Sequence, residues 1–157
     1  MKGRSSLFDG KRSRIASGDI SFMGNGKRAD FARYISNRPD KDPNGMFDVI
    51  AHGTSKFIEV SAGNKTYLFD ARQAANLIRR QQGFSKSKSV RLLSCSTGAD
   101  PAGFAQHLAN ALGKPVYAPN NIIYSYPNGK YWIKNVDSKT RGEFIEFKPG
   151  GIKHGKK

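Results

Sequence analysis

Two short and mainly apolar segments are the feature that most constrains how this chain can fold. They are Met46–Ala51, a near-continuous apolar run, and Ser89–Leu93, a second expected buried strand in which three of five residues are apolar; both contain β-branched residues. An apolar run without polar alternation is typical of a strand that is buried on both faces. Strands of that kind occur in parallel sheets whose two faces are covered by helices. We therefore expect an α/β domain built on a mainly parallel, Rossmann-like sheet in three layers.

Helical spacing between and after these segments supports that expectation. Apolar residues over 71–82 recur at helical intervals after the capping residue Asp70, and Gly83 provides a stop signal. A second helix is predicted to open at Asp100-Pro101 and to run to about residue 112. Strands that alternate with helices are the pattern of parallel crossover units.

Shorter patterns complete the predicted domain. The further expected elements are a helix within 27–37, a strand at 116–118, an edge strand at 143–147, and antiparallel hairpins within 57–69 and 122–133. The two ends are basic and rich in glycine, and they carry few apolar residues that would join a core. We therefore expect a flexible lead-in at 1–19, one domain at 20–148 and a flexible tail at 149–157.

Composition narrows the possible classes of function. The 157 residues hold 27 Lys and Arg against 12 Asp and Glu, a net charge of +15. A field of that sign attracts nucleic acid, anionic lipid, polyphosphate or an acidic protein. Cys95 is the only cysteine, which excludes an internal disulfide framework and a cysteine-cluster zinc site. We find no metal-ligand spacing, no cofactor motif and no apolar run of about 18 residues, so we expect no metal, no cofactor and no membrane span.

A candidate reaction centre lies where the two buried strands end. His52 follows the first strand and Cys95 follows the second, and carboxyl ends of parallel strands share one edge of a sheet. A cysteine nucleophile and an imidazole that protonates the leaving amine make a two-residue catalytic site. Gly53 lets backbone approach the reacting carbonyl, and its N–H beside that of Cys95 would form an oxyanion hole.

The neighbours of Cys95 add to this prediction. We expect the positive charges of Lys86, Lys88 and Arg91 to favour the thiolate form of the cysteine. Three hydroxyl side chains would line the site, namely Ser94, Ser96 and Thr97.

The ordered pair of strand-end blocks resembles a known group of enzymes. Phe47–Gly53 and Val90–Ser96 are similar to the paired blocks of caspase-fold cysteine peptidases, which include caspases, gingipains, legumains and the autoprocessing domains of large bacterial toxins. The closer likeness, over 46–133, is to C-terminal toxin domains of bacterial Rhs and contact-dependent-inhibition polymorphic toxins. Its further blocks are Phe104–Ala109 and Val116–Pro119.

This resemblance implies a fold, a reaction and a biological setting. A caspase-like sheet would carry His52 and Cys95 as a catalytic dyad and Gly53 as an oxyanion donor, although the segment before residue 46 is short for the preceding strands of a full caspase sheet. The chain would be the C-terminal part of a larger exported toxin. It would act as a cysteine endopeptidase on a protein substrate in the target-cell cytoplasm. The distribution of positive charge suits an acidic immunity protein as its cognate partner.

Two other interpretations stay open. The positive charge would also serve a nucleic-acid-directed toxin, a nuclease or translation inhibitor on the same scaffold. The second hairpin would then stack bases through aromatic residues flanked by Lys130 and Lys134; these are Tyr124, Tyr126, Tyr131 and Trp132. Alternatively, the chain is a catalytically silent binding module, in which Cys95 is a small hydrophobe and His52 a satisfied polar group. His107 is expected at the surface in either case.

Overall fold

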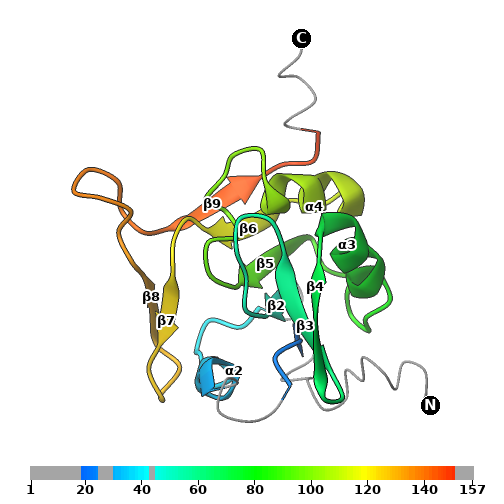
Figure 1. Ribbon diagram of the computed structural model, residues 1–157, viewed down its shortest axis with the longest axis horizontal. Helices are drawn as coiled ribbons and strands as arrows, with labels where there is room; N and C mark the ends of the chain where they lie inside the picture. The colour runs from blue at the N-terminus through cyan, green and yellow to red at the C-terminus, as the bar shows by residue number, and fades with distance from the viewer. Residues whose placement is uncertain (1–18, 25–29, 43–44, 151–157) are drawn as a thin grey trace.

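A five-stranded sheet forms the centre of the computed structural model, which describes residues 19–24, 30–42 and 45–150 (Figure 1). Its strand order is β1-β2-β5-β6-β9; the first four strands run parallel and β9 is antiparallel to β6. The bounds are β1 (Asp19–Ser21), β2 (Met46–Ile50), β5 (Ser89–Leu93), β6 (Val116–Pro119) and β9 (Phe144–Phe147). The predicted α/β class and the mainly parallel sheet are confirmed.

Helices and hairpins cover both faces of this sheet. The helices are α2 (Asp30–Ile35), α3 (Ala71–Arg79) and α4 (Phe104–Leu112), and the antiparallel hairpins are β3–β4 (Ile58–Ala62, Lys65–Phe69) and β7–β8 (Ile123–Ser125, Tyr131–Ile133). One hydrophobic cluster joins α3, α4 and β3 to the face that carries Phe47 and Val49. A second, smaller cluster joins α2 and β7–β8 to the opposite face, which carries Ile50 and Leu93. Side chains that alternate along β2 therefore pack into two separate cores.

Helix α3 begins as the sequence predicts and ends earlier. The Asp70 side chain accepts from the Gln73 N–H, and the Gln73 side chain accepts from the Asp70 N–H, each at 2.9 Å, which completes a capping box. The helix ends at Arg79 rather than at residue 82. The N–H groups of Arg80 and Gln81 donate to carbonyls three residues back, as in a 3₁₀ turn, instead of four residues back.

The predicted start of α4 at Asp100-Pro101 was wrong by about three residues. The Asp100 carboxylate accepts from the Ala102 N–H at 2.9 Å, and the Gly103 N–H donates to the Asp100 carbonyl, so this segment is a turn. Gly103 is the N-cap, with non-helical backbone angles. The Phe104 N–H at the start of the helix then donates to the Ser55 carbonyl at 2.8 Å. A contact with the loop after β2 thus replaces the expected side-chain cap.

Strand β1 is an element that the sequence pattern did not predict. It pairs in parallel with β2, and Phe22 and Met23, which follow it, are buried. The rest of the predicted lead-in, residues 1–18, and the end of the predicted tail, residues 151–157, lie outside the described residues. Among the described helices, none is long and apolar enough to cross a membrane.

Candidate functional site

The loops after β2 and β5 leave the sheet at the same edge. The two strands are parallel neighbours, and their last residues, Ile50 and Leu93, are register partners. His52-Gly53 and the segment 94–98 follow directly. The prediction that His52 and Cys95 follow adjacent strands at one rim of the sheet is confirmed, because a parallel register brings both carboxyl ends together.

Gly53 lies directly against the Cys95 loop. A Cβ atom added at Gly53 would stand 2.7 Å from Thr97 Cγ2, and 3.3 Å from both the Cys95 carbonyl oxygen and Ser94 Cβ. A larger residue at this position would require the Thr97 side chain or the 94–97 loop to move. The absence of a side chain therefore lets the two rim loops touch.

Two backbone N–H groups of the described rim loops donate to no other residue. Gly53 forms a bridge with Ile58 in which the flanking residues make the bonds: the Thr54 N–H donates to Phe57, and the Glu59 N–H donates to His52. Within the described part of the chain, neither the Gly53 N–H nor the Cys95 N–H donates to another residue. Both are thus available to an acceptor outside the protein.

The loop that carries Cys95 is held in a strained conformation. Ser96 has φ +58°, and it is the one non-glycine residue with a positive φ among those described. Its N–H donates to the Asn121 carbonyl at 3.1 Å, and the Gly98 N–H donates to Pro119 at 2.8 Å. Connections to the chain after β6 therefore impose this backbone turn directly after the cysteine.

The predicted site-lining hydroxyls divide into two groups. Ser94 and Thr97 are buried, and their hydroxyls lie 3.0 Å apart in a mutual hydrogen bond. The Thr97 hydroxyl donates to the Ser94 carbonyl at 3.2 Å, so the Ser94 hydroxyl is the donor between the two side chains. These two side chains stabilise the loop. Ser96 is half-buried and contributes through its backbone, as described above.

The Cys95 thiol is half-buried beside the smaller core. Its Sγ atom donates to the Ile123 carbonyl on β7 at 3.8 Å, and its side chain packs against the second hydrophobic cluster. Burial raises the pKa of Cys95 and outweighs the lowering effect of the backbone groups of Ile123 and of Cys95 itself. The resting side chain is accordingly a neutral thiol at physiological pH.

The prediction that three cations favour the Cys95 thiolate was wrong. Lys86 and Lys88 precede β5, whereas Cys95 follows it, so a strand of about 16 Å separates them. Lys88 lies at the opposite edge of the sheet, where its N–H bonds the Gly45 carbonyl. Arg91 lies inside β5, and its guanidinium is bound to carboxylates.

His52 is half-buried, and its backbone is fixed by the β3–β4 hairpin. Its carbonyl accepts from the Glu59 N–H at 2.9 Å, one residue before the Gly53–Ile58 bridge. At the end of β2, Ile50 faces the smaller core and Ala51 the larger one. β2 ends at Ile50, so His52 belongs to the rim loop, whereas Cys95 packs on the face that carries Ile50.

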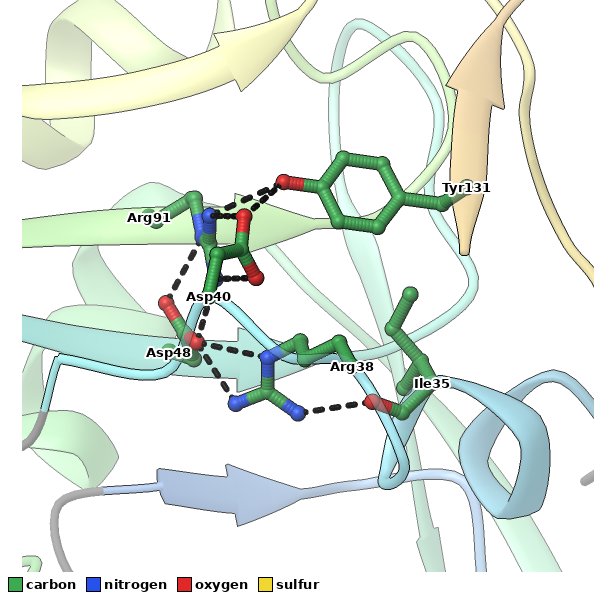
Figure 2. A network of polar contacts seen from close by, with 6 residues as sticks. All are labelled: Ile35, Arg38, Asp40, Asp48, Arg91 and Tyr131. Carbon is green, nitrogen blue, oxygen red and sulfur yellow. Dashed lines mark hydrogen bonds and ion pairs between the residues drawn. The ribbon is translucent and has the colours of Figure 1, made fainter. Parts of the chain in front are cut away.

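A buried polar network lies on the same face, further from the rim (Figure 2). Asp48 and Arg91 are register partners on β2 and β5, and the Arg91 Nε and Nη2 atoms donate to the two Asp48 oxygens at 2.9 and 2.8 Å. Arg38 donates to Asp48 Oδ2 from Nε at 3.0 Å and from Nη2 at 2.6 Å. Arg91 also donates to Asp40 and to the Tyr131 hydroxyl, and the Tyr131 hydroxyl bonds Asp40.

The sequence analysis missed this network, although a signal was present. Each of the two apolar strands carries one charged residue at its centre, Asp48 in the first and Arg91 in the second. A charge inside a doubly buried strand requires a partner of opposite sign. Opposite charges at the same place in two adjacent strands therefore indicated a pair.

The network shifts the ionisation of its members. Burial alone would lower the pKa of Arg91, but hydrogen bonds and charge from Asp48 and Asp40 raise it above the usual value. Burial, together with the Asp40 hydrogen bond, raises the pKa of Tyr131 to about 12. For Asp40, burial opposes ionisation, and the bonds from Arg91 and Tyr131 prevail and lower the pKa. Asp40 and Arg91 thus stay charged at neutral pH.

A groove of about 670 Å³ opens beside the rim, on the face that α3 and α4 cover. Its lining includes Ser55, two residues after Gly53, and the first residues of both helices. Its charged and polar lining residues are Lys56, Asp70, Arg72, Asp100, His107 and Asn110. His107 is exposed, as expected from the helical pattern. The described residues contain no group of three or more metal-binding side chains.

Comparison with known proteins identifies the family of this chain. No curated protein matches the chain. A family model matches residues 18–133, which include every element from β1 to β8 and leave out β9. His52, Gly53, Cys95 and the polar network all lie inside the matched region. The chain therefore belongs to the family described as domain of unknown function DUF8616.

Proposed function

We propose that this protein is a cysteine endopeptidase with a caspase-like sheet, in which Cys95 is the nucleophile and His52 the general acid and base. The observation that carries the proposal is the contact between Gly53 and the Cys95 loop, where two backbone N–H groups donate to no other residue among those described. Such a pair beside a thiol is what a tetrahedral oxyanion requires.

The half-buried thiol defines the first chemical step. Because burial raises the pKa of Cys95, the thiol loses its proton during attack rather than before it. The Cys95 Sγ atom forms a bond to a substrate backbone carbonyl, and His52 takes the thiol proton. The N–H groups of Gly53 and Cys95 then stabilise the negative oxygen of the tetrahedral intermediate.

The remaining steps regenerate the enzyme. The intermediate collapses, the peptide C–N bond breaks, and the imidazolium of His52 gives its proton to the departing amine. An acyl-enzyme on Cys95 remains. Water, deprotonated by His52, attacks the thioester carbonyl and releases the carboxylate product together with the thiol. No cofactor takes part in these steps.

The groove beside the rim is the place for the substrate chain. It includes Ser55, two residues after Gly53, and runs along the beginning of α3 and most of α4. Because the Cys95 side chain packs on the opposite face of the sheet, a substrate chain would cross the rim to reach both the thiol and the groove. Its polar lining suits a peptide segment whose backbone and polar side chains need hydrogen-bond partners. We place substrate residues on one side of the cleaved bond in this groove.

The proposed biological role rests on the resemblance of the strand-end blocks to polymorphic-toxin domains. In this role the domain is exported as part of a larger toxin, cleaves a protein in the target-cell cytoplasm, and is neutralised in its producer by an acidic immunity protein. The net charge of +15 supports an acidic partner through complementary charge.

The test is expression of wild type, Cys95→Ala and His52→Ala in the bacterial cytoplasm, with Ser138→Ala as an exposed control. We expect wild type and Ser138→Ala to stop growth and to produce new protein N-termini in the proteome. Each dyad substitution should reduce the cleavage rate by roughly 10⁴-fold or more. Thermal unfolding of the purified variants checks that the fold is retained.

Two outcomes would end the peptidase proposal. One is full toxicity of the folded Cys95→Ala variant. The other is fragmented RNA or DNA with an intact proteome, which would favour a nucleic-acid-directed toxin.

A further inference from the structure

The outer face of the β7–β8 hairpin exposes large aromatic side chains. Tyr124, Tyr126 and Trp132 are 40%, 54% and 44% exposed, whereas Ile123 on the inner face is buried. The hairpin lies on the opposite side of the molecule from α3 and α4 (Figure 1). This surface is therefore separate from the groove that the proposed peptidase uses.

Two of these aromatic residues form a flat platform. Tyr124 and Trp132 are register partners, and their rings stack with centroids 4.5 Å apart and planes at 23°. Because side chains alternate along a strand, Lys130 and Lys134 share the face of Trp132. We call this surface, made of Tyr124, Tyr126, Lys130, Trp132 and Lys134, the aromatic–lysine face.

No acidic side chain neutralises the aromatic–lysine face from within its own segment. The sequence contains no Asp or Glu from 101 to 136. Within the described residues, neither Lys130 nor Lys134 forms an ion pair. Both ammonium groups are thus open to an anionic ligand.

The hairpin that presents this face is held rigidly. The Asn37 side chain donates to the Pro127 carbonyl at 2.9 Å, and Gly129 lies so close to Asn37 and Arg38 that an added Cβ would stand 2.2 Å from the Asn37 carbonyl carbon. On the inner face, Tyr131 bonds Arg91 and Asp40 (Figure 2). An isolated two-stranded hairpin is marginally stable, so these contacts are what fix the platform. The hairpin therefore loses little conformational entropy when a ligand binds.

We propose that the aromatic–lysine face binds single-stranded nucleic acid. Every base has a flat face that can stack on the Tyr124–Trp132 pair or on Tyr126, and the phosphates match Lys130 and Lys134. The carboxylates of an acidic peptide would pair with the two lysines, but the peptide would offer no flat surface to stack on the aromatic rings. An apolar protein surface would cover the rings and bury both ammonium groups without partners, which is unfavourable. The net charge of +15 favours approach of the polyanion.

The test uses intrinsic fluorescence, because Trp132 is the only tryptophan in the chain. The full chain is titrated with 20-nucleotide oligouridylate, 20-nucleotide oligodeoxyuridylate, a 20-base-pair DNA duplex and polyglutamate. We expect strong quenching by one or both single strands and weaker quenching by the duplex and polyglutamate. The two single strands show whether the sugar matters.

Variants separate stacking from charge. By anisotropy with a labelled single strand, Trp132→Ala should weaken binding by about 5- to 150-fold, while Trp132→Phe should stay close to wild type. Lys130→Ala with Lys134→Ala should reduce the steepness of log K against log salt by about 1.4, a change that Trp132→Ala should not cause. The matched controls on the β3–β4 hairpin are Tyr67→Ala and Lys65→Ala, which should bind like wild type.

Three results would overturn the inference. They are equal quenching by polyglutamate and single strands, binding of duplex as tight as that of single strands, and Trp132→Ala binding like Tyr67→Ala. The folded Cys95→Ala variant should bind nucleic acid normally, so failure of the peptidase proposal and failure of this inference give different results.

Discussion

At the scale of single residues, two features shape the rim of the sheet: Gly53 has no side chain, and Ser96 has a positive φ. Gly53 leaves room for the 94–97 loop, and Ser96 takes a left-handed conformation that serine seldom adopts. Strain of this kind persists only where surrounding bonds impose it. Here the Asn121 and Pro119 carbonyls hold the loop on both sides of Ser96.

Replacement of Ser96 by glycine should stabilise the protein. Glycine adopts φ +58° without the steric cost, and the gain exceeds the added flexibility of the unfolded chain, so we expect about 0.5–1 kcal/mol. Urea denaturation measures the change. Ser138→Gly, in an exposed loop without positive φ, is the control and should be neutral or destabilising. A destabilised Ser96→Gly variant would contradict the assignment of strain.

The ionisation of Cys95 gives a second prediction at this scale. Because its pKa is raised, the thiolate fraction at pH 7.5 is lower than for an exposed cysteine, and alkylation by iodoacetamide should be slow. The rate should rise at higher pH than in the urea-unfolded chain, which serves as the reference. Cys95 is the only thiol, so the signal has one source. Fast alkylation at pH 6 would show a preformed thiolate instead.

At the scale of elements, a network of ion pairs joins β2 and β5 to the segments around them. Asp48 of β2 receives Arg91 from β5 and Arg38 from the segment after α2, and Arg91 continues to Asp40 and Tyr131 of β8. The Arg91 guanidinium also lies 5.8 Å from the ring centroids of both Tyr131 and Phe144. The β7–β8 hairpin is thereby attached to the sheet beside the Cys95 loop.

Removal of the central carboxylate should strongly destabilise the fold. Asp48 is 1% exposed, and Asp48→Asn would leave the buried Arg38 without its carboxylate, so we expect a loss of about 3–5 kcal/mol. The matched control is Asp30→Asn, because Asp30 pairs with Arg33 at the surface and should contribute at most about 1 kcal/mol. Chemical denaturation measures both values. Equal effects of the two substitutions would contradict this role.

At the scale of the whole molecule, β9 completes the sheet beyond the region that the family model matches. It pairs with β6 from Val116↔Phe147 to Pro119↔Phe144 and covers the edge that β6 would otherwise expose. Phe147 is buried in the larger hydrophobic cluster, and Phe144 packs against the smaller one. Both cores therefore depend on a strand outside residues 18–133.

Truncation of Phe147 should show this dependence. Phe147→Ala removes a buried ring that joins β9 to the larger core, and we expect a loss of about 3–5 kcal/mol. Leu68→Ala, at a side chain that is 56% exposed on β4, should change stability by no more than about 0.5 kcal/mol. Thermal and urea unfolding compare the two variants. A Phe147→Ala protein as stable as Leu68→Ala would show that β9 is dispensable.

Features that depend on local pattern were predictable from the sequence. Local patterns account for the two doubly buried strands, the Asp70 capping box and both hairpins. Burial periodicity, capping residues and turn residues all depend on neighbours in the chain. The shared rim of His52 and Cys95 also followed, because parallel strands have one carboxyl edge. The start of α4 did not, since its first N–H bonds the distant Ser55 carbonyl.

The sequence by itself thus determined the class of sheet and the residues at its rim, and the tertiary structure decided their electrostatic surroundings. Lys86 and Lys88 are close to Cys95 in the chain but lie across the length of β5 from it, and Arg91 is paired with carboxylates. The charge state of a thiol depends on burial and on distances through space, which strand register and packing set. The Asp48–Arg91 pair likewise arises only once β2 and β5 lie side by side, and the free direction of the Gly53 N–H arises only once Gly53 meets Ile58 of β3.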